Sequence, residues 1–150
     1  MNADWLDLLR ELRASEVRFL LVGAHAVGVH GVPRATRDLD VWVDPTRENS
    51  ARVIDALARF GAPLASIGVQ RSDFETPDRV VQIGVPPNRI DLMTSLSGLP
   101  EFSSAWDRRK SATIGGVAVE VLGLEDLLVN KRASGRDKDR VDLRELGSLG

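Results

Sequence analysis

Two aspartates separated by one apolar residue are the side chains of this sequence best suited to chemistry. Asp38 and Asp40 begin the segment Asp-Leu-Asp-Val-Trp-Val, residues 38 to 43, in which polar and apolar residues alternate. Because alternate side chains of a β-strand point to the same face, both carboxylates are expected to lie side by side. Like charges that close raise the pKa of one carboxylate, whereas a divalent cation between them turns the repulsion into a binding site. The pair therefore predicts a metal site.

A third carboxylate lies in a second apolar stretch. Asp91 stands between two aliphatic residues, where a purely solvent-facing role is not expected. Carboxylate oxygens are the ligands that Mg²⁺ prefers, and Mn²⁺ accepts them as well. We therefore interpret Asp38, Asp40 and Asp91 as catalytic residues and as ligands of Mg²⁺ or Mn²⁺. The alternative is a set of ordinary ion pairs, Asp38 with Arg37 and Asp91 with Arg89, with Asp40 facing solvent.

A glycine turn precedes the aspartate pair. The mainly apolar residues 17 to 22 predict a first strand buried on both faces, and Gly23 follows where a strand hands over to a helix. Residues 25 to 30 are compatible with a short helix, and the backbone amides at its start would suit an anion. His25 and His30 are too far apart in sequence to share one helix face, so we expect packing or loop-bonding roles for them rather than metal binding.

Other segments show helical and strand-like patterns. Strand patterns with turn residues between them predict two hairpins, one over residues 80 to 93 and one over residues 112 to 121. Residues 62 to 77 are weakly patterned and are expected to form a loop with one short irregular piece. Pattern alone does not fix the sheet order. Periodicity, caps and charge order predict helices over residues 3 to 15, 46 to 61, 102 to 109, 124 to 132 and 136 to 146.

Composition and charge bound the function classes. The 150 residues match the size of one domain, and the net charge of -2 is typical of an ordinary globular protein without a polybasic tail. The absence of cysteine excludes thiolate chemistry and leaves oxygen or histidine as metal ligands. With no membrane-length apolar run and no signal-peptide pattern, we expect a cytoplasmic protein that does not contact membranes. Trp5, Trp42 and Trp106 fall at amphipathic positions and are expected in the core.

The order and spacing of these features resemble the DNA polymerase β-type nucleotidyltransferases. In that superfamily an apolar residue, Gly, and Gly or Ser precede a carboxylate pair in a strand, and a third carboxylate flanked by apolar residues follows. Here Gly23 and Ala24 precede Asp38 by a gap of thirteen residues, and Ile90-Asp91-Leu92 matches the third element. The segments GAHAVGVHGVPRATRDLD and KRASGRDKDRVDL are similar to minimal nucleotidyltransferases of the AbiEii type, toxin components of abortive-infection systems.

This resemblance, which spans residues 17 to 146, implies a role for each matching position. The backbone amides of Gly23 and Ala24 would contact the nucleotide phosphates, although Ala24 lacks the hydroxyl of the usual serine. The aspartate pair would hold Mg²⁺, and Asp91 would complete the site and help to deprotonate an acceptor hydroxyl. The AbiEii-like pattern also implies that Lys131, Lys138 and Asp139 face the nucleotide.

Two basic segments have two interpretations each. Arg34, Thr36 and Arg37 lie just before the aspartate pair and either contact phosphate or acceptor, or form a solvated loop that balances the carboxylates. The C-terminal segment has more basic than acidic residues, and its alternative to nucleotide binding is an ordinary charged helix with pairs such as Lys138 with Asp142. We keep both segments as candidate nucleotide-binding regions.

Together these features favour one α+β domain over residues 1 to 150, with the polymerase β-like nucleotidyltransferase fold and a small mixed β-sheet flanked by helices. We expect a Mg²⁺-dependent enzyme that transfers a nucleoside monophosphate from a nucleoside triphosphate to a hydroxyl by two-metal catalysis. The acceptor is RNA, a protein or a small molecule. A partner protein or a homodimer would supply an acceptor-binding surface, and the AbiEii-like resemblance favours a toxin–antitoxin setting.

Two other function classes compete with this hypothesis. A catalytically weak copy of the fold could act as a binding or regulatory module, for example as an antitoxin; the intact carboxylates argue against it and Ala24 argues for it. A metal-dependent phosphohydrolase or nuclease would also use a carboxylate cluster. Such enzymes usually add histidines, and neither His25 nor His30 is well placed for that role.

Overall fold

Of the 150 residues, the computed structural model describes residues 1 to 147. The strands are β1 (Phe19–Val22), β2 (Asp38–Val43), β3 (Val80–Ile83), β4 (Arg89–Met93), β5 (Lys110–Ile114) and β6 (Val117–Val121). The helices are α1 (Ala3–Ala14), α2 (Gly23–Val29), α3 (Arg47–Phe60), α4 (Phe102–Asp107), α5 (Leu124–Ser134), α6 (Asp137–Gly147) and the short 3₁₀ helix η1 (Arg71–Phe74).

A six-stranded mixed sheet in the order β3-β4-β2-β1-β6-β5 forms the centre of the molecule. β2 pairs with β1 in antiparallel and with β4 in parallel orientation, so the strands with the predicted carboxylates are neighbours. The two predicted hairpins are present as the antiparallel pairs β3–β4 and β5–β6. The prediction of an α+β fold with a mixed sheet flanked by helices is therefore confirmed.

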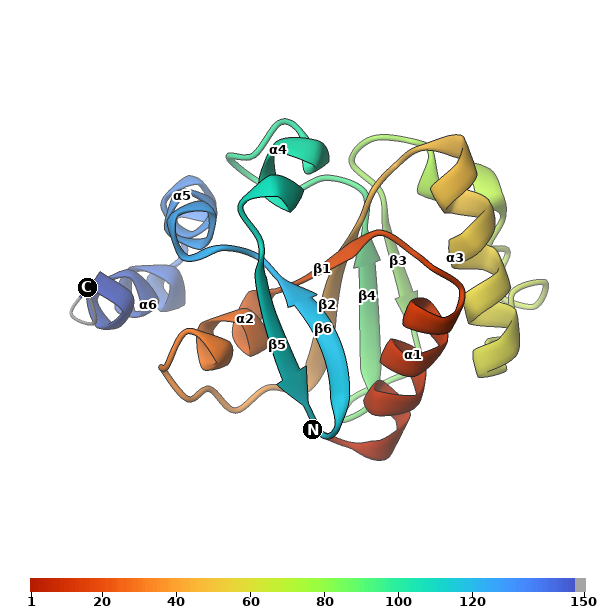
Figure 1. Cartoon of the computed structure of the whole chain (residues 1–150), viewed down its shortest axis with the longest axis horizontal. Coiled ribbons are helices and arrows are strands. Elements are labelled where there is room, and N and C mark those ends of the chain that lie inside the picture. The colour runs from red at the N-terminus through yellow and green to blue at the C-terminus, as the bar shows by residue number, and fades with distance from the viewer. Residues whose placement is uncertain (148–150) are drawn as a thin grey trace.

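Helices cover both faces of this sheet. In Figure 1, α1 and α3 lie on one side, while α2, α5 and α6 lie on the other. All four residues of β1 are buried, as predicted for a strand covered on both faces. Trp5 and Trp42 are buried in the core and Trp106 packs against it, which confirms their predicted positions. No helix among residues 1 to 147 combines the length and the apolarity needed to cross a membrane.

Local sequence explains where most elements begin and end. The side chain of Asn2 accepts a hydrogen bond from the backbone of Trp5 and caps α1, and Thr46 caps α3 in the same way. α3 ends at Gly61 in the left-handed conformation. The weakly patterned segment 62–77 is mainly turn and loop, as predicted, with η1 as its one helical piece, which buries Phe74.

Candidate active site

The sheet register brings the three predicted carboxylates together. Asp40 lies directly opposite Asp91 in the parallel pair β2–β4, and Asp38 lies opposite Arg89. One oxygen from each of Asp38, Asp40 and Asp91 lies within 4.8 Å of the other two. These three side chains, named the carboxylate cluster below, come from two neighbouring strands and point to one face of the sheet.

Gly23 is required by the position of Asp40. Val22 at the end of β1 pairs with Asp40, so the turn into α2 runs directly beside that carboxylate. A Cβ atom on residue 23 would overlap with Oδ2 of Asp40. The residue also has a φ angle of +66°, which only glycine adopts without strain. The glycine therefore lets the backbone of the turn approach the carboxylate cluster, and α2 begins at this glycine turn, as predicted.

Arg89 bridges two members of the cluster. Its Nη2 donates to Oδ2 of Asp91 at 2.9 Å and to Oδ2 of Asp38 at 3.3 Å. The predicted alternative pair of Asp91 with Arg89 is thus present, but Asp38 also pairs with Arg89 rather than with Arg37. Arg89 holds one oxygen of each partner, so the second oxygen of each carboxylate stays available to another ligand.

The electrostatics of the cluster favour a cation. Burial, together with the neighbouring charges of Asp91 and Asp38, raises the pKa of Asp40 from 3.8 to about 6, against the opposing effects of Lys138 and Arg89. Asp91 is only 6% exposed, and its Oδ1 has no hydrogen-bond partner among the described residues. A buried oxygen without a partner beside two further carboxylates is a donor set that fits Mg²⁺ or Mn²⁺.

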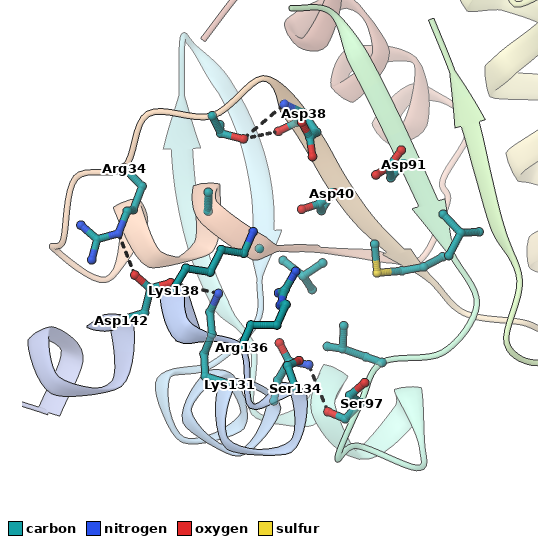
Figure 2. A pocket seen from close by; sticks show the side chains of 18 of the residues that line it. Arg34, Asp38, Asp40, Asp91, Ser97, Lys131, Ser134, Arg136, Lys138 and Asp142 are labelled. Carbon is teal, nitrogen blue, oxygen red and sulfur yellow. Dashed lines mark hydrogen bonds and ion pairs between the residues drawn. The ribbon is translucent and has the colours of Figure 1, made fainter. Parts of the chain in front are cut away.

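A cleft of about 710 Å³, named the main cleft below, opens above the carboxylate cluster. One wall comes from the turn at Gly23 and Ala24, and the opposite wall comes from the end of α5 and the start of α6. Figure 2 shows the side chain of Lys138 extending from α6 toward Asp40. No ion pair of Lys138 is present among the described residues, so its charge faces the cluster across the cleft.

Lys131, a predicted nucleotide-binding residue, lines the main cleft but is almost fully buried in this wall. Its Nζ lies 3.1 Å from both Asp139 and Asp142, and only 3% of the residue is exposed. Asp139 is fully buried and does not line the main cleft. Burial alone would raise the pKa of Asp139, but hydrogen bonds from Arg136 and Lys131 lower it below its usual value. These contacts join α5 to α6 and hold the wall in place.

The predicted pair of Lys138 with Asp142 is wrong. Asp142 instead bonds to Lys131 and to Nε of Arg34, the latter at 2.7 Å. Buried Lys131 provides Asp142 with a closer partner than the exposed Lys138. The result leaves the ammonium group of Lys138 in the cleft, as Figure 2 shows.

The loop before β2 has three different environments. Arg34 lines the main cleft and is tied to α6 through Asp142 and Glu145. Thr36 also lines the cleft, where its hydroxyl donates to the carbonyl of Asp38 at 3.0 Å and accepts from the amide of that residue at 3.2 Å. Arg37 is exposed and lies outside the cleft lining. Its contact with a nucleotide therefore stays a prediction without support from the geometry.

Both histidines have the structural roles predicted for them. His25 packs edge-on against Trp5 with ring centroids 5.1 Å apart, and burial lowers its pKa. Nε2 of His30 lies 2.8 Å from the carbonyl oxygen of Leu122. Neither ring belongs to the carboxylate cluster.

Several polar residues of the cleft were not singled out from the sequence. Gln82 lies opposite Asp91 in the hairpin β3–β4, and strand alternation combined with the correct hairpin register would have placed it on the same face. Arg136 lines the cleft from the loop between α5 and α6, and the sequence indicated it only as a member of the basic C-terminal segment. Asn130 donates to the backbone of Ser97 across the cleft, a contact that depends on tertiary structure alone.

The mixed sheet and the carboxylate cluster beside a glycine turn define a nucleotidyltransferase fold. A family model described as a nucleotidyltransferase of unknown function, DUF6036, matches residues 5–148. The chain therefore belongs to this nucleotidyltransferase family. No curated protein sequence matches the chain.

Solved structures with the same fold cover almost the whole chain. The lincosamide antibiotic adenylyltransferase LnuA, bound to lincomycin, is 16% identical with a TM-score of 0.66, over 100% of this chain and 98% of that chain. A nucleotidyltransferase structure from Thermotoga maritima is 15% identical with a TM-score of 0.61, over 100% and 96%. The antibiotic-resistance factor ANT(2'')-Ia is 14% identical with a TM-score of 0.62, over 100% and 86%. At these identities the likeness concerns the fold.

Proposed function

We propose that this protein transfers a nucleoside monophosphate from a nucleoside triphosphate to a hydroxyl group. The observation that carries the proposal is the carboxylate cluster, in which Oδ1 of Asp91 has no partner among the described residues, with the ammonium group of Lys138 across the main cleft. Negative groups that collect a cation beside positive groups that attract phosphates are the combination that phosphoryl transfer needs.

Asp38, Asp40 and Asp91 would hold Mg²⁺ or Mn²⁺. When bound, one or two such cations would neutralise the phosphates and lower the pKa of the acceptor hydroxyl. Arg89 orients the cluster by holding Oδ2 of Asp38 and Oδ2 of Asp91, which leaves the other oxygen of each carboxylate for the cation.

Other residues of the main cleft would bind the triphosphate. The backbone at Gly23 and Ala24 offers amides at the turn, and Lys138 and Arg136 offer cations from the opposite wall. Lys131 lies in that wall and Asp139 beneath it, where their ion pair positions Arg136 and the helix carrying Lys138.

In the transfer, the acceptor oxygen attacks the α-phosphorus, and the bond to the pyrophosphate group breaks. The hydroxyl proton passes to the carboxylate of Asp91. Pyrophosphate leaves on the side of Lys138 and Arg136, which balance its charge.

The setting and the acceptor are separate parts of the proposal. The AbiEii-like segments support a toxin–antitoxin setting, in which the acceptor is RNA or a protein. LnuA, which has the same fold, is described as an adenylyltransferase of a lincosamide antibiotic. This supports ATP as the first nucleotide to test and a small molecule as a third acceptor class. Growth arrest on expression in a bacterial host, relieved by Asp40→Asn, would support the toxin setting, and unimpaired growth would remove it.

The test of transfer uses the purified protein with each α-³²P-labelled nucleoside triphosphate, Mg²⁺ and total bacterial RNA. Asp38→Ala/Asp40→Ala serves as the control. Label on RNA or on the protein that is lost in the control supports transfer and names the nucleotide. Release of inorganic phosphate instead of pyrophosphate would support a phosphohydrolase. Nucleotide binding that is unaffected by EDTA and by Asp40→Ala would support a binding module.

A further inference from the structure

A second pocket continues from the main cleft along the same face of the sheet. This side pocket has a volume of about 610 Å³ and lies beside the end of β2, under the segment that leads into α4. Ser95 and Leu96 line both the side pocket and the main cleft, so the two spaces meet at these residues.

Strand geometry places the side pocket close to the carboxylate cluster. Trp42 forms part of its wall and follows Asp40 by two residues in β2, so both side chains point to the same face. Two residues of a strand span about 7 Å. Met93, which lies opposite Trp42 in β4, follows Asp91 in the same way and lines the main cleft. A molecule of a few sugar rings could therefore reach from the side pocket to Asp91.

The walls of the side pocket are mainly apolar and include a buried donor that has no partner among the described residues. Phe102 packs edge-on against Trp42 with ring centroids 5.1 Å apart, and Leu99 and Leu96 complete the apolar lining. Trp42 is 1% exposed, and its indole Nε1 has no hydrogen-bond partner among the described residues. A buried indole N–H without a partner beside an open pocket suits a ligand that carries an acceptor oxygen.

The charges of the side pocket are opposite to those of the nucleotide-binding wall. Glu75 and Asp78 line the side pocket, and no lysine, arginine or histidine does so in the described part of the chain. Glu75 has a loose pair with Arg71 at 3.5 Å, and Asp78 forms no ion pair among the described residues. A polyanion such as RNA is therefore disfavoured in this pocket, whereas a cation is favoured.

We propose that the side pocket is the acceptor subsite and that the acceptor is a small hydroxylated amine. The inference rests on the proposed transfer activity and names its acceptor class. The ammonium groups face Glu75 and Asp78, an oxygen accepts from the indole of Trp42, and the body of the molecule passes Leu96 so that one hydroxyl reaches Asp91.

Binding is tested without catalysis by following the indole N–H signals of the three tryptophans in two-dimensional ¹H–¹⁵N NMR spectra. The probe is the β-1,4-linked disaccharide of glucosamine, and its neutral counterpart is the N,N'-diacetylated form. The amine is expected to shift the Trp42 signal, and the acetylated form is not. Glu75→Gln with Asp78→Asn should weaken the affinity for the amine about tenfold, since charges in contact with solvent contribute modestly. Asp55→Asn, an exposed change in α3, should leave binding unchanged.

Three results would overturn the inference. These are an unmoved Trp42 signal, equal binding of both sugars, or wild-type affinity in the doubly substituted variant. In the transfer assay, preferential labelling of RNA over the amine would also overturn it. Backbone amide shifts at Gly23 and Ala24 on addition of nucleotide and Mg²⁺ report the main cleft separately. If these shifts occur but the amine does not bind, the acceptor class is wrong and the proposed activity stands. If the shifts at Gly23 and Ala24 are absent, the proposed activity itself fails.

Discussion

Asp40 is the residue at which function and stability conflict most directly. Burial and two neighbouring carboxylates raise its pKa to about 6, so the folded protein without a cation prefers the protonated form. The unfolded chain has the lower ordinary value of 3.8. As the pH rises through this interval, the unfolded state loses its proton first, and the free energy of unfolding falls. The ionised residue thus destabilises the cation-free fold at neutral pH.

Asp40→Asn is therefore expected to stabilise the cation-free protein at neutral pH by about 1 to 3 kcal/mol, while it abolishes transfer. Urea unfolding with EDTA present measures the gain, which should shrink toward about pH 4 as the wild-type carboxyl becomes protonated. Asp55→Asn on the exposed surface of α3 is the control and should change little. A loss of stability in Asp40→Asn at neutral pH would contradict this account.

The same carboxyl predicts how cation binding depends on pH. A proton and a cation compete for Asp40, so Mn²⁺ affinity should fall by up to about tenfold per pH unit below about pH 6 and level off above that value. Titration of Mn²⁺ followed by electron paramagnetic resonance measures the affinity directly. An affinity that is constant from about pH 5 to about pH 7.5 would show that Asp40 is ionised throughout or is not a ligand.

Gly23→Ala tests the close approach of backbone and carboxylate. An alanine Cβ would overlap with Asp40 and would hold a left-handed φ, so we expect a loss of about 1 to 3 kcal/mol together with weaker Mn²⁺ binding. Gly61→Ala is a matched control because Gly61 is also left-handed but has no atoms within 4 Å of the added Cβ. It should lose some stability and keep its Mn²⁺ affinity. Equal Mn²⁺ affinity in both variants would contradict the proposed reason for the glycine.

At the scale of elements, the sequence was most informative where patterns are local. Alternation in residues 38 to 43 and the glycine and proline turns of the two hairpins predicted strands that the structure contains. The sheet order depends on contacts between distant segments, such as Leu21 of β1 with Val121 of β6, and no local pattern encodes it. η1 was predicted only as an irregular piece, because Phe74 is its one buried residue and a single apolar residue gives no periodic pattern.

The candidate site was predictable to the same extent. The carboxylate cluster and Gly23 follow from types and spacing of residues, and the structure brings them together. Lys131 shows the limit of prediction from sequence. A lysine at that position is expected at the surface, and only the packing of α6, with Asp139 and Asp142, shows that it is buried in ion pairs. The bridging role of Arg89 became visible only with the β2–β4 register.

Lys131→Met is expected to detach α6 from α5. The substitution leaves Asp139 and Asp142 buried without their shared ammonium partner, which should cost about 3 kcal/mol and reduce nucleotide binding through displacement of Lys138. Arg10→Met, which breaks the exposed pair with Asp7, is the control and should have too small an effect to resolve. Hydrogen exchange of the α6 amides would report the detachment, and unchanged protection would contradict it.

At the scale of the whole molecule, one core connects all these parts. The buried cluster contains Trp5 from α1, Phe102 from α4 and Leu146 from α6 together with residues of the sheet. We therefore propose a single folding domain and expect one cooperative thermal transition. Tryptophan fluorescence and far-ultraviolet circular dichroism should give the same midpoint. A separate earlier transition that removes only helical signal would show that α5 and α6 unfold on their own.

The division of the main cleft between early and late parts of the chain affects when activity begins. The carboxylate cluster is complete once residue 91 has been synthesised, but the wall with Lys138 needs α5 and α6. A nascent chain on the ribosome that has formed only β1 to β4 could collect a cation and would lack the positive groups for the triphosphate. Domains fold as they leave the ribosome, so catalysis should start only after α6 has cleared the exit tunnel. Translation would thus delay a reactive enzyme until α6 has docked.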